Sequence, residues 1–308
     1  MSAPDSVLLI AFGGPEKPAD VRPFLQLVTA GRSVPPERIE EVAHHYEAMG
    51  GRSPLNELTF EQAKGLRRLL KRDGVAAPVY VGMRNWHPFL HETLAAMKDL
   101  GHRRALGIIL SPFQTEASWE RYMADVAAAR EKVGPVAPEV AYAPAWFDHP
   151  RFIEAVADRG RDALAAIPPE TRPSAPLIFT AHSVPAAMAG GSPYVAQFTA
   201  SARAVAEKLS HPRWSVAYQS RSGSPHEPWL EPDIADVLRN LAQASVSDVV
   251  VAPIGFVCDH VEVLYDLDVE ARQLAEKLGM RFYRAAAVND HPAFVEMLAA
   301  LARSGLGK

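Results

Sequence analysis

A run of fourteen residues, Val257 to Glu270, holds five carboxylates and one histidine but no lysine or arginine. Within it, Glu262, Asp266 and Glu270 are spaced four residues apart, so on a helix they lie along one face. Like charges at this spacing destabilise a helix by roughly 0.2 to 0.5 kcal/mol per pair. Carboxylate oxygens are also ligands for divalent metal ions. The run therefore indicates either a site for a divalent cation or a solvated helix edge, and charge alone leaves both open.

His182 follows an apolar stretch, Leu177 to Thr180, that has the character of a buried strand. A neutral imidazole at such a strand end can act as a base near physiological pH. A single histidine is more often a capping or core residue, but Asp259, His260 and Glu262 follow another predicted strand, and this favours a base. Because His260 and Glu262 are two residues apart, they cannot share a helical face. We therefore expect His260 to orient other groups and not to be a second metal ligand.

A third chemical signal is the turn that follows the helical segment ending at Gly50 and Gly51. It presents the guanidinium of Arg52 and the hydroxyl of Ser53, a combination that suits an anionic oxygen. The alternative is a helix C-cap followed by an N-cap serine with no ligand. Gly50 serves the capping role under either interpretation.

Positioning these groups requires strands and helices in alternation, and the chain shows that pattern. Short apolar or β-branched runs alternate with longer segments of helical period, which is typical of parallel strands joined by crossover helices. The predicted strands are Val7 to Phe12, Val79 to Met83, Leu106 to Leu110, Val140 to Ala143, Leu177 to Thr180, Ser215 to Gln219, Asp248 to Pro253 and Arg281 to Tyr283. The predicted helices include Glu37 to Met49, Glu57 to Lys71, Glu120 to Lys132, Tyr194 to Leu209, Pro232 to Gln243 and Val261 to Leu278.

The order of these elements predicts two similar Rossmann-like α/β domains, each a four-stranded parallel sheet flanked by helices. We place them at residues 1–147 and 148–308, with the C-terminal helix able to pack back on the first domain. Ligands bind beyond the carboxyl ends of strands in such sheets, so one large ligand held between the domains is expected. Polar or glycine-rich loops follow six of the strands: Gly13 to Pro15, Arg84 to Pro88, Ser111 to Glu116, Ala181 to Pro185, Ser220 to Ser224 and Gly255 to Glu262.

Composition excludes several classes of protein. The net charge of −4 and the scattered basic residues argue against nucleic-acid binding. Cys258 is the single cysteine, so a disulfide framework, a cysteine zinc site and a protein-ligated iron–sulfur cluster are not expected. The N-terminal segment has no basic stretch, and Val7 to Phe12 is too short for a signal peptide, so we expect a cytoplasmic protein. Walker A, Gly-x-Gly-x-x-Gly, Gly-x-Ser-x-Gly and His-Glu-x-x-His motifs are absent.

Four motifs, in order and spread over nearly the whole chain, resemble those of the ferrochelatase family. They are Tyr46 to Leu55, Ala181 to Pro185, Tyr218 to Ser220 with Pro228 to Asp233, and Gly255 to Asp266. The resemblance implies two similar α/β domains with a porphyrin cleft between them, and insertion of Fe²⁺ into the porphyrin as the reaction. It also implies porphyrin and ferrous iron as substrates and no tightly bound cofactor.

By position, the resemblance assigns roles to individual residues. His182 and Glu262 match the catalytic pair that faces the metal, and Asp266 and Glu270 match an acidic metal-binding row on a helix widened toward π-helical geometry. The residues matching those that hold porphyrin propionates are Tyr46, Arg52, Ser53 and Tyr122. Two positions depart from the family pattern: Phe12 stands where some bacterial relatives have tyrosine, and Asn85 stands where others have histidine or tyrosine.

Metal insertion requires loss of two pyrrole protons, a route for the cation and apolar walls for the macrocycle. The candidate walls are Phe12, Trp86, Phe113 and Phe256, although an aromatic residue taken alone is more often part of the core. A protein that stores haem without catalysis and a chelatase for another metal, such as cobalt, are the alternatives. The sequence leaves coproporphyrin and protoporphyrin open as substrates. We expect a monomer, and transient contacts with a membrane surface or with other haem-pathway enzymes are compatible with it.

Overall fold

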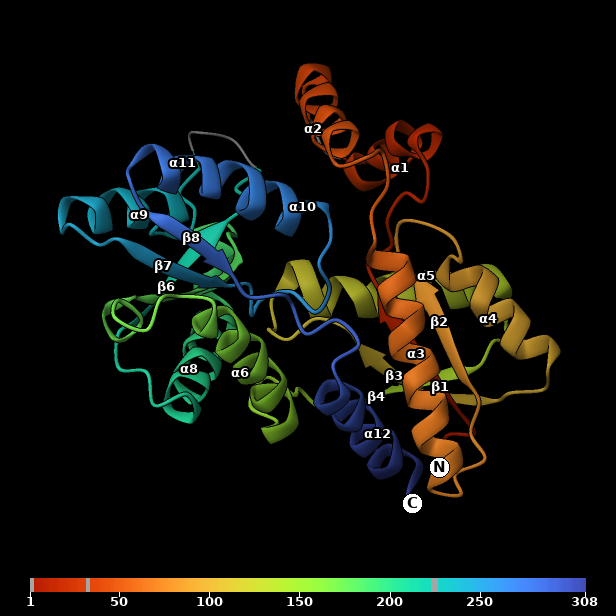
Figure 1. The fold of residues 1–308 in the computed structure, drawn as a ribbon. Coiled ribbons are helices and arrows are strands. Elements are labelled where there is room, and N and C mark those ends of the chain that lie inside the picture. Colours follow the sequence, from red (N-terminus) through yellow and green to blue (C-terminus); the bar gives the residue numbers. More distant parts are fainter. Residues whose placement is uncertain (1–2, 32–33, 223–226) are drawn as a thin grey trace. The chain divides into compact units, whose positions relative to one another are not determined.

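The structure is a computed structural model that describes residues 3–31, 34–222 and 227–308 (Figure 1). Gly223 and Ser224, in the loop predicted after the sixth strand, lie outside the described residues. By its internal contacts the chain divides into two compact units. The first comprises Met1–Ser111, Ala117–Pro144 and Val295–Lys308, and the second comprises Pro112–Glu116 and Ala145–Phe294.

The first unit is built on a parallel sheet with the strand order β2-β1-β3-β4. Its strands are β1 (Ser6–Ala11), β2 (Val79–Met83), β3 (Arg104–Ile109) and β4 (Glu139–Tyr142). Its helices are η1 (Pro18–Asp20), α1 (Val21–Thr29), α2 (Pro36–Ala48), α3 (Leu55–Arg72), α4 (Leu90–Asp99), the π-helical η2 (Glu116–Glu120), α5 (Arg121–Val133) and α12 (Pro292–Leu306). Helix α12 packs so closely on the sheet that a Cβ at Gly305 would lie 2.5 Å from the Leu106 side chain.

The second unit repeats this plan with the strand order β6-β5-β7-β8. Its strands are β5 (Leu177–His182), β6 (Trp214–Gln219), β7 (Asp248–Ala252) and β8 (Arg281–Arg284). Its helices are α6 (Pro150–Ala165), η3 (Arg172–Ser174), α7 (Ala186–Gly190), α8 (Tyr194–Lys208), α9 (Ile234–Gln243), α10 (Val261–Val263), the π-helical η4 (Leu264–Ala271) and α11 (Arg272–Lys277). In Figure 1 the last three run on from one another in blue.

The predicted fold class is confirmed: two four-stranded parallel sheets, each flanked by helices, form among the described residues. All eight predicted strands are present, with ends displaced by no more than two residues. The central strands β1 and β7 are buried along their whole length, as expected for strands covered on both faces. Two helix starts differ by two residues from those predicted. Helix α3 begins at Leu55 and not at Glu57. Helix α9 begins at Ile234 and not at Pro232, because Asp233 caps it by accepting the N–H of Ala235 at 2.8 Å.

The strand order decides where chemistry can be placed in the second unit. From β5 the chain moves to one side to form β6, then crosses to the other side of β5 to form β7. The carboxyl ends of β5 and β7 are therefore neighbours at the switch point of the sheet, where ligands of such folds bind. In the part of the chain that the structure describes, no helix combines the length and apolar character needed to cross a membrane.

Gly255 lets the loop after β7 approach β5, and its replacement by alanine gives a first prediction. A Cβ at this position would lie 2.6 Å from the Cα of Ala181, and that backbone atom cannot rotate away. We expect Gly255→Ala to lower the free energy of unfolding by about 1 to 3 kcal/mol. Urea denaturation measures this, with Gly190→Ala as the control because nothing lies within 4 Å of a Cβ there. Equal stabilities of the two variants would contradict the close approach.

Candidate functional site

His182 and Glu262 face each other at the switch point of the second sheet. His182 is the last residue of β5, and Glu262 lies in α10, ten residues after the end of β7. The Nε2 atom of His182 lies 3.9 Å from Oε2 of Glu262, and the two side chains are 32% and 46% exposed. A base and a carboxylate thus meet where solvent and a ligand both have access. Two residues that are 80 positions apart in sequence are brought together by the pairing of β5 with β7.

The backbone fixes the protonation pattern of His182. Its Nδ1 is hydrogen-bonded to the carbonyl oxygen of Ser183, and since a carbonyl only accepts, Nδ1 carries the proton. In the neutral ring Nε2 is then unprotonated and points its lone pair toward Glu262. Nε2 can therefore accept a proton or bind a metal ion without a change of tautomer.

His260 has the opposite arrangement and orients the turn into α10. Its Nδ1 accepts the backbone N–H of Glu262 at 3.2 Å, which makes it the N-cap of that helix. Burial lowers the pKa of His260, while the nearby Glu262 and Asp259 carboxylates raise it by less, so the ring stays neutral. The expectation that His260 orients the neighbouring groups agrees with this capping contact.

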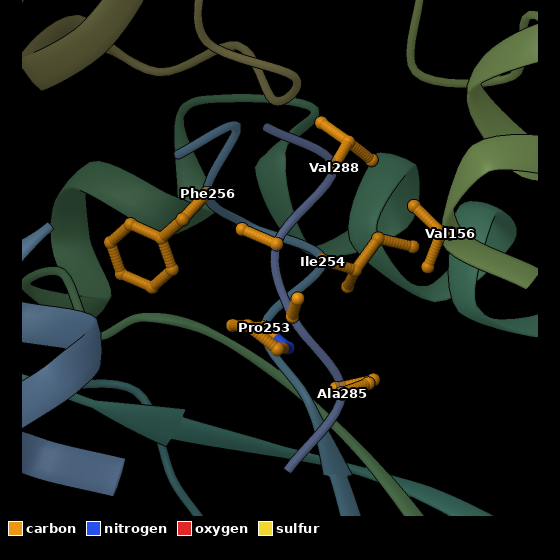
Figure 2. Close-up of a pocket in the computed structure, with 9 residues that line it drawn as sticks. Val156, Pro253, Ile254, Phe256, Ala285 and Val288 are labelled. Carbon is orange, nitrogen blue, oxygen red and sulfur yellow. The ribbon is translucent and has the colours of Figure 1, made fainter. Parts of the chain in front are cut away.

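The ring of Phe256 lies near both imidazoles, with centroids 6.5 Å from that of His182 and 4.9 Å from that of His260. Figure 2 shows Phe256 at the edge of a small pocket, its ring extending away from the side where Val156 and Val288 lie. Every residue lining that pocket is apolar. The pocket therefore supplies no ligand group, and Phe256 is the part of it that lies close to the two imidazole rings.

The acidic row formed by Glu262, Asp266 and Glu270 is held in place by a row of apolar residues, the first three of which directly follow the acids. Val263, Leu267, Ala271 and Ala275 are buried in the core of the second unit against Val249 and Val251 of β7 and Ile178 of β5. Glu262, Asp266 and Glu270 each precede one of these buried positions. The stretch from Leu264 to Ala271 is π-helical, as the family resemblance implied. Burial of the apolar row thus fixes the direction in which the acids point.

Asp266 is the most perturbed acid of the row. The pKa of its carboxyl group is raised to about 7, chiefly by burial and also by the neighbouring Glu262 and Glu270, against a hydrogen bond from Ser220 Oγ to Oδ2 that lowers it. Asp266, Glu270 and Ser220 line a cavity of about 160 Å³. Its other lining residues are Gln219, Asp233, Ile234, Ala235, Ala271 and Leu274. The pKa of Asp233 is also raised, chiefly by burial. The cavity thus offers carboxylate, amide and hydroxyl oxygens beside apolar side chains such as Ile234 and Leu274.

In the first unit, the Tyr46 and Ser53 side chains lie beside the loops that follow β1 and β2. Tyr46 is buried in α2, and its ring contacts Phe24 with centroids 6.0 Å apart. Phe24 in turn contacts Trp86 at 6.1 Å. Ser53 is buried beside Gly14 and donates its backbone N–H to the carbonyl of Pro15 at 2.8 Å. Arg52, which precedes Ser53, has an exposed side chain.

The Tyr122 ring lies at the same edge of the first sheet, where it contacts the largely buried guanidinium group of Arg84. The guanidinium of Arg84 lies 4.4 Å from the centroid of the Tyr122 ring and 5.7 Å from that of Phe12. The same group forms an ion pair with Asp125, one turn further along α5. Asn85 donates its side-chain amide to the carbonyl of Phe12 at 3.1 Å, so it supports the loop after β1.

Of the candidate wall residues, Phe113 is 1% exposed and packs on Tyr194 and Phe198, so it belongs to the core, which is the alternative that the sequence left open for it. Sequence reasoning assigned no role to four supporting groups: Arg84, Asp125, Gln219 and Asp233. Arg84, Gln219 and Asp233 lie within loops or motifs quoted from the sequence, whereas Asp125 lies in none of them.

Across residues 3–31, 34–222 and 227–308, no three His, Cys, Asp or Glu side chains are arranged to hold one metal ion. His182 and Glu262 form a pair, and Asp266 bonds to a hydroxyl.

Comparisons with known proteins agree on one family. A family model described as Ferrochelatase matches residues 4–306. The ferrochelatase of Rhodopirellula baltica is 42% identical over 308 residues, which cover 99% of this chain and 87% of that protein. The coproporphyrin III ferrochelatase of Nocardia farcinica is 45% identical over 312 residues, which cover 99% of this chain and 89% of that protein.

Among solved structures, SirB from Bacillus subtilis with Fe³⁺ matches with a TM-score of 0.58. The match covers 98% of this chain and 95% of that one at 12% identity. At this identity the likeness concerns the fold alone, and it agrees with the two parallel sheets described above.

The raised pKa of Asp266 predicts how stability varies with pH. The folded protein holds this proton more tightly than the unfolded chain, so the contribution of Asp266 to stability is fully present below about pH 4 and is lost as pH rises through about 7. At about 1.4 kcal/mol per pKa unit, the cost at pH 8 is on the order of 2 to 4 kcal/mol. Asp266→Asn removes this cost of ionisation. We therefore expect the variant to have a higher melting temperature than the wild type at pH 8 but not at pH 4.

Thermal unfolding at the two pH values measures this difference. Glu276→Gln, on the exposed side of α11, is the control and is expected to leave the pH profile unchanged. Superimposable profiles of Asp266→Asn and wild type would show that burial does not perturb this carboxyl group.

Proposed function

The chain belongs to the ferrochelatase family, and from this premise we propose that it inserts Fe²⁺ into coproporphyrin III during haem biosynthesis. As a ferrochelatase it is a lyase whose substrates are a porphyrin and ferrous iron. The narrower choice of porphyrin is supported by the name of the Nocardia farcinica relative. The observation that carries the chemistry is the 3.9 Å approach of His182 Nε2 to Glu262 Oε2.

We assign the proton chemistry to this pair. A free-base porphyrin loses two pyrrole protons for each divalent ion that it takes up, so the site needs an acceptor with a pKa near neutrality. His182 presents an unprotonated Nε2, and Glu262 stabilises the imidazolium that forms when this atom takes a proton. Glu262 is also close enough to share that proton, or to hold the entering cation with Nε2.

Asp266, Glu270 and Ser220 are proposed to supply ferrous iron to the pair. Their oxygens line one cavity, and oxygen ligands suit hydrated divalent cations that must be released again. An arriving cation favours the ionised form of Asp266, so its uptake expels the proton that burial retains there. Cation uptake beside Asp266 is therefore coupled to release of the proton from that fraction of the protein in which Asp266 is still protonated.

In the first unit, Tyr46, Arg52, Ser53 and Tyr122 are proposed to bind the propionate groups. The exposed guanidinium of Arg52 and the Ser53 hydroxyl are suitable donors to a carboxylate. Arg84 holds the ring of Tyr122 by its stacking contact, so that ring keeps one orientation.

We also propose that the protein is a monomer that acts in the cytoplasm. It would make transient contacts with a membrane surface or with other enzymes of the haem pathway. We also propose that it works without a tightly bound cofactor. A protein-ligated iron–sulfur cluster is disfavoured by the sequence, since Cys258 is the single cysteine.

Substitution of the proposed base tests the assignment. We expect His182→Ala to lower kcat for Fe²⁺ or Zn²⁺ insertion by about 10²- to 10⁴-fold, the usual contribution of a general base. Porphyrin binding, followed by fluorescence quenching, should persist. His211→Ala is the control, since that ring contacts the Ala175 carbonyl before β5 begins and should not affect kcat. Metal insertion by His182→Ala at a rate near that of the wild type would refute the assignment of His182 as the base.

The choice of porphyrin is tested by initial rates with coproporphyrin III and protoporphyrin IX. We expect faster insertion into coproporphyrin III, and Arg52→Ala should raise its KM by about tenfold through loss of one charge-assisted contact. Arg68→Ala, an exposed arginine on α3, is the control. A preference for protoporphyrin IX would overturn the choice of coproporphyrin III as the substrate. Tight binding of a porphyrin without insertion of iron or cobalt would indicate a storage protein.

A further inference from the structure

Arg284, the last residue of β8, binds two carboxylates of the acidic run with one guanidinium group. Its Nη1 donates to Oδ1 of Asp259 at 2.7 Å, and its Nε lies 2.8 Å from both oxygens of Asp268. The Arg284 and Asp259 side chains are only 13% and 14% exposed. Burial alone would lower the pKa of Arg284, but the hydrogen bond to Asp268 and the charge of Asp259 outweigh it and raise the pKa. The cation is therefore permanently charged in this position.

The contact with Asp259 fixes the chain before Glu262. Besides Arg284, Asp259 accepts the N–H of Ala287 at 3.1 Å and the side-chain amide of Asn289 at 2.8 Å. The backbone N–H of Asp259 donates to the amide oxygen of Asn289 at 2.9 Å. The backbone and the side chain of this residue are thus both held, three positions before Glu262.

The contact with Asp268 fixes the chain after Glu262. Asp268 lies in the π-helical segment, two positions beyond Asp266. Arg272 joins Asp268 at 3.4 Å and donates to the carbonyl of Phe282 at 2.9 Å, so the same segment has a second link to β8. Glu262 and Asp266 therefore lie between two carboxylates that a single guanidinium holds.

We propose that Arg284 is a positioning residue for metal insertion: by bridging Asp259 and Asp268 it holds the intervening chain so that Glu262 faces His182. This inference rests on the proposed function of that pair. Arg284 also places one positive charge between two of the five acids in the run, so the repulsion that Glu262 experiences from its neighbours is reduced. Lysine cannot replace it fully, because a point charge cannot bridge two carboxylates as a planar fork does.

The same strand provides a matched control. Arg281, the first residue of β8, forms a two-pronged ion pair with buried Asp248 at 2.7 Å for each contact. Asp248 is the first residue of β7, at the opposite end of the sheet from His182. If both arginines only stabilise the fold, their substitution should change kcat to the same extent. If Arg284 positions Glu262, only the substitution of Arg284 should lower kcat.

The test compares Arg284→Gln and Arg281→Gln in steady-state metal insertion at a temperature where both are folded. We expect Arg284→Gln to lower kcat about 100-fold with an unchanged KM for the porphyrin, since a displacement of about 1 Å at a reacting group has that effect. Arg284→Lys should give an intermediate kcat, and Arg281→Gln should keep the wild-type kcat. Equal losses of kcat in the two glutamine variants would overturn the proposal. If Arg284→Gln does not fold, Arg284→Lys and Arg281→Lys make the same comparison.

A second readout separates this inference from the proposed function. Amide hydrogen exchange between Val261 and Val269 should become faster in Arg284→Gln and stay unchanged in Arg281→Gln. If the wild-type protein inserts no metal, the proposed function fails. Amide hydrogen exchange then still tests whether Arg284 holds the chain between Asp259 and Asp268. Unchanged exchange in Arg284→Gln would overturn the inference even if the wild type is active.

Discussion

The pairing of β5 with β7 is the interaction on which the candidate site of the second unit depends. It aligns Phe179 with Ala252, the last residue of β7, so the loop after β7 runs beside the last three residues of β5, which end at His182. Gly255 then donates its N–H to the carbonyl of Thr180 at 3.0 Å, an approach that a side chain at Gly255 would prevent. The backbone itself therefore brings the loop with Glu262 to the end of the strand with His182.

Stability and chemistry oppose each other along the acidic row. The apolar positions Val263, Leu267 and Ala271 stabilise the segment by burial, and the same burial forces Asp266 into a site that resists its ionisation. Ionisation of Asp266 therefore costs stability, and its neutral replacement should stabilise the fold. A carboxyl group whose pKa is raised in this way is typical of sites that handle protons or cations.

The sequence predicted what depends on local pattern and missed what depends on distant pairing. Apolar runs identified every strand, because strands buried on both faces need continuous apolar sequence. The four-residue spacing of the acids predicted one face but not the π-helical widening, which only the family resemblance implied. Arg284 escaped notice because its partners are chosen by the pairing of β8 with β7, which aligns Arg284 with Val251. For Phe113 the sequence left the role open, since an aromatic residue after a strand looks the same whether it lines a ligand site or packs on Phe198.

The contact between His182 and the carbonyl of Ser183 has a consequence for the path of protons. A peptide oxygen accepts a hydrogen bond but does not carry a proton away, so the Nδ1 side of the ring is closed to transfer. A proton that enters at Nε2 must leave from Nε2, and the imidazole cannot relay it across the ring into the protein interior. Uptake and release then occur on the one face that Glu262 shares, and each proton must clear that face before the next can be taken.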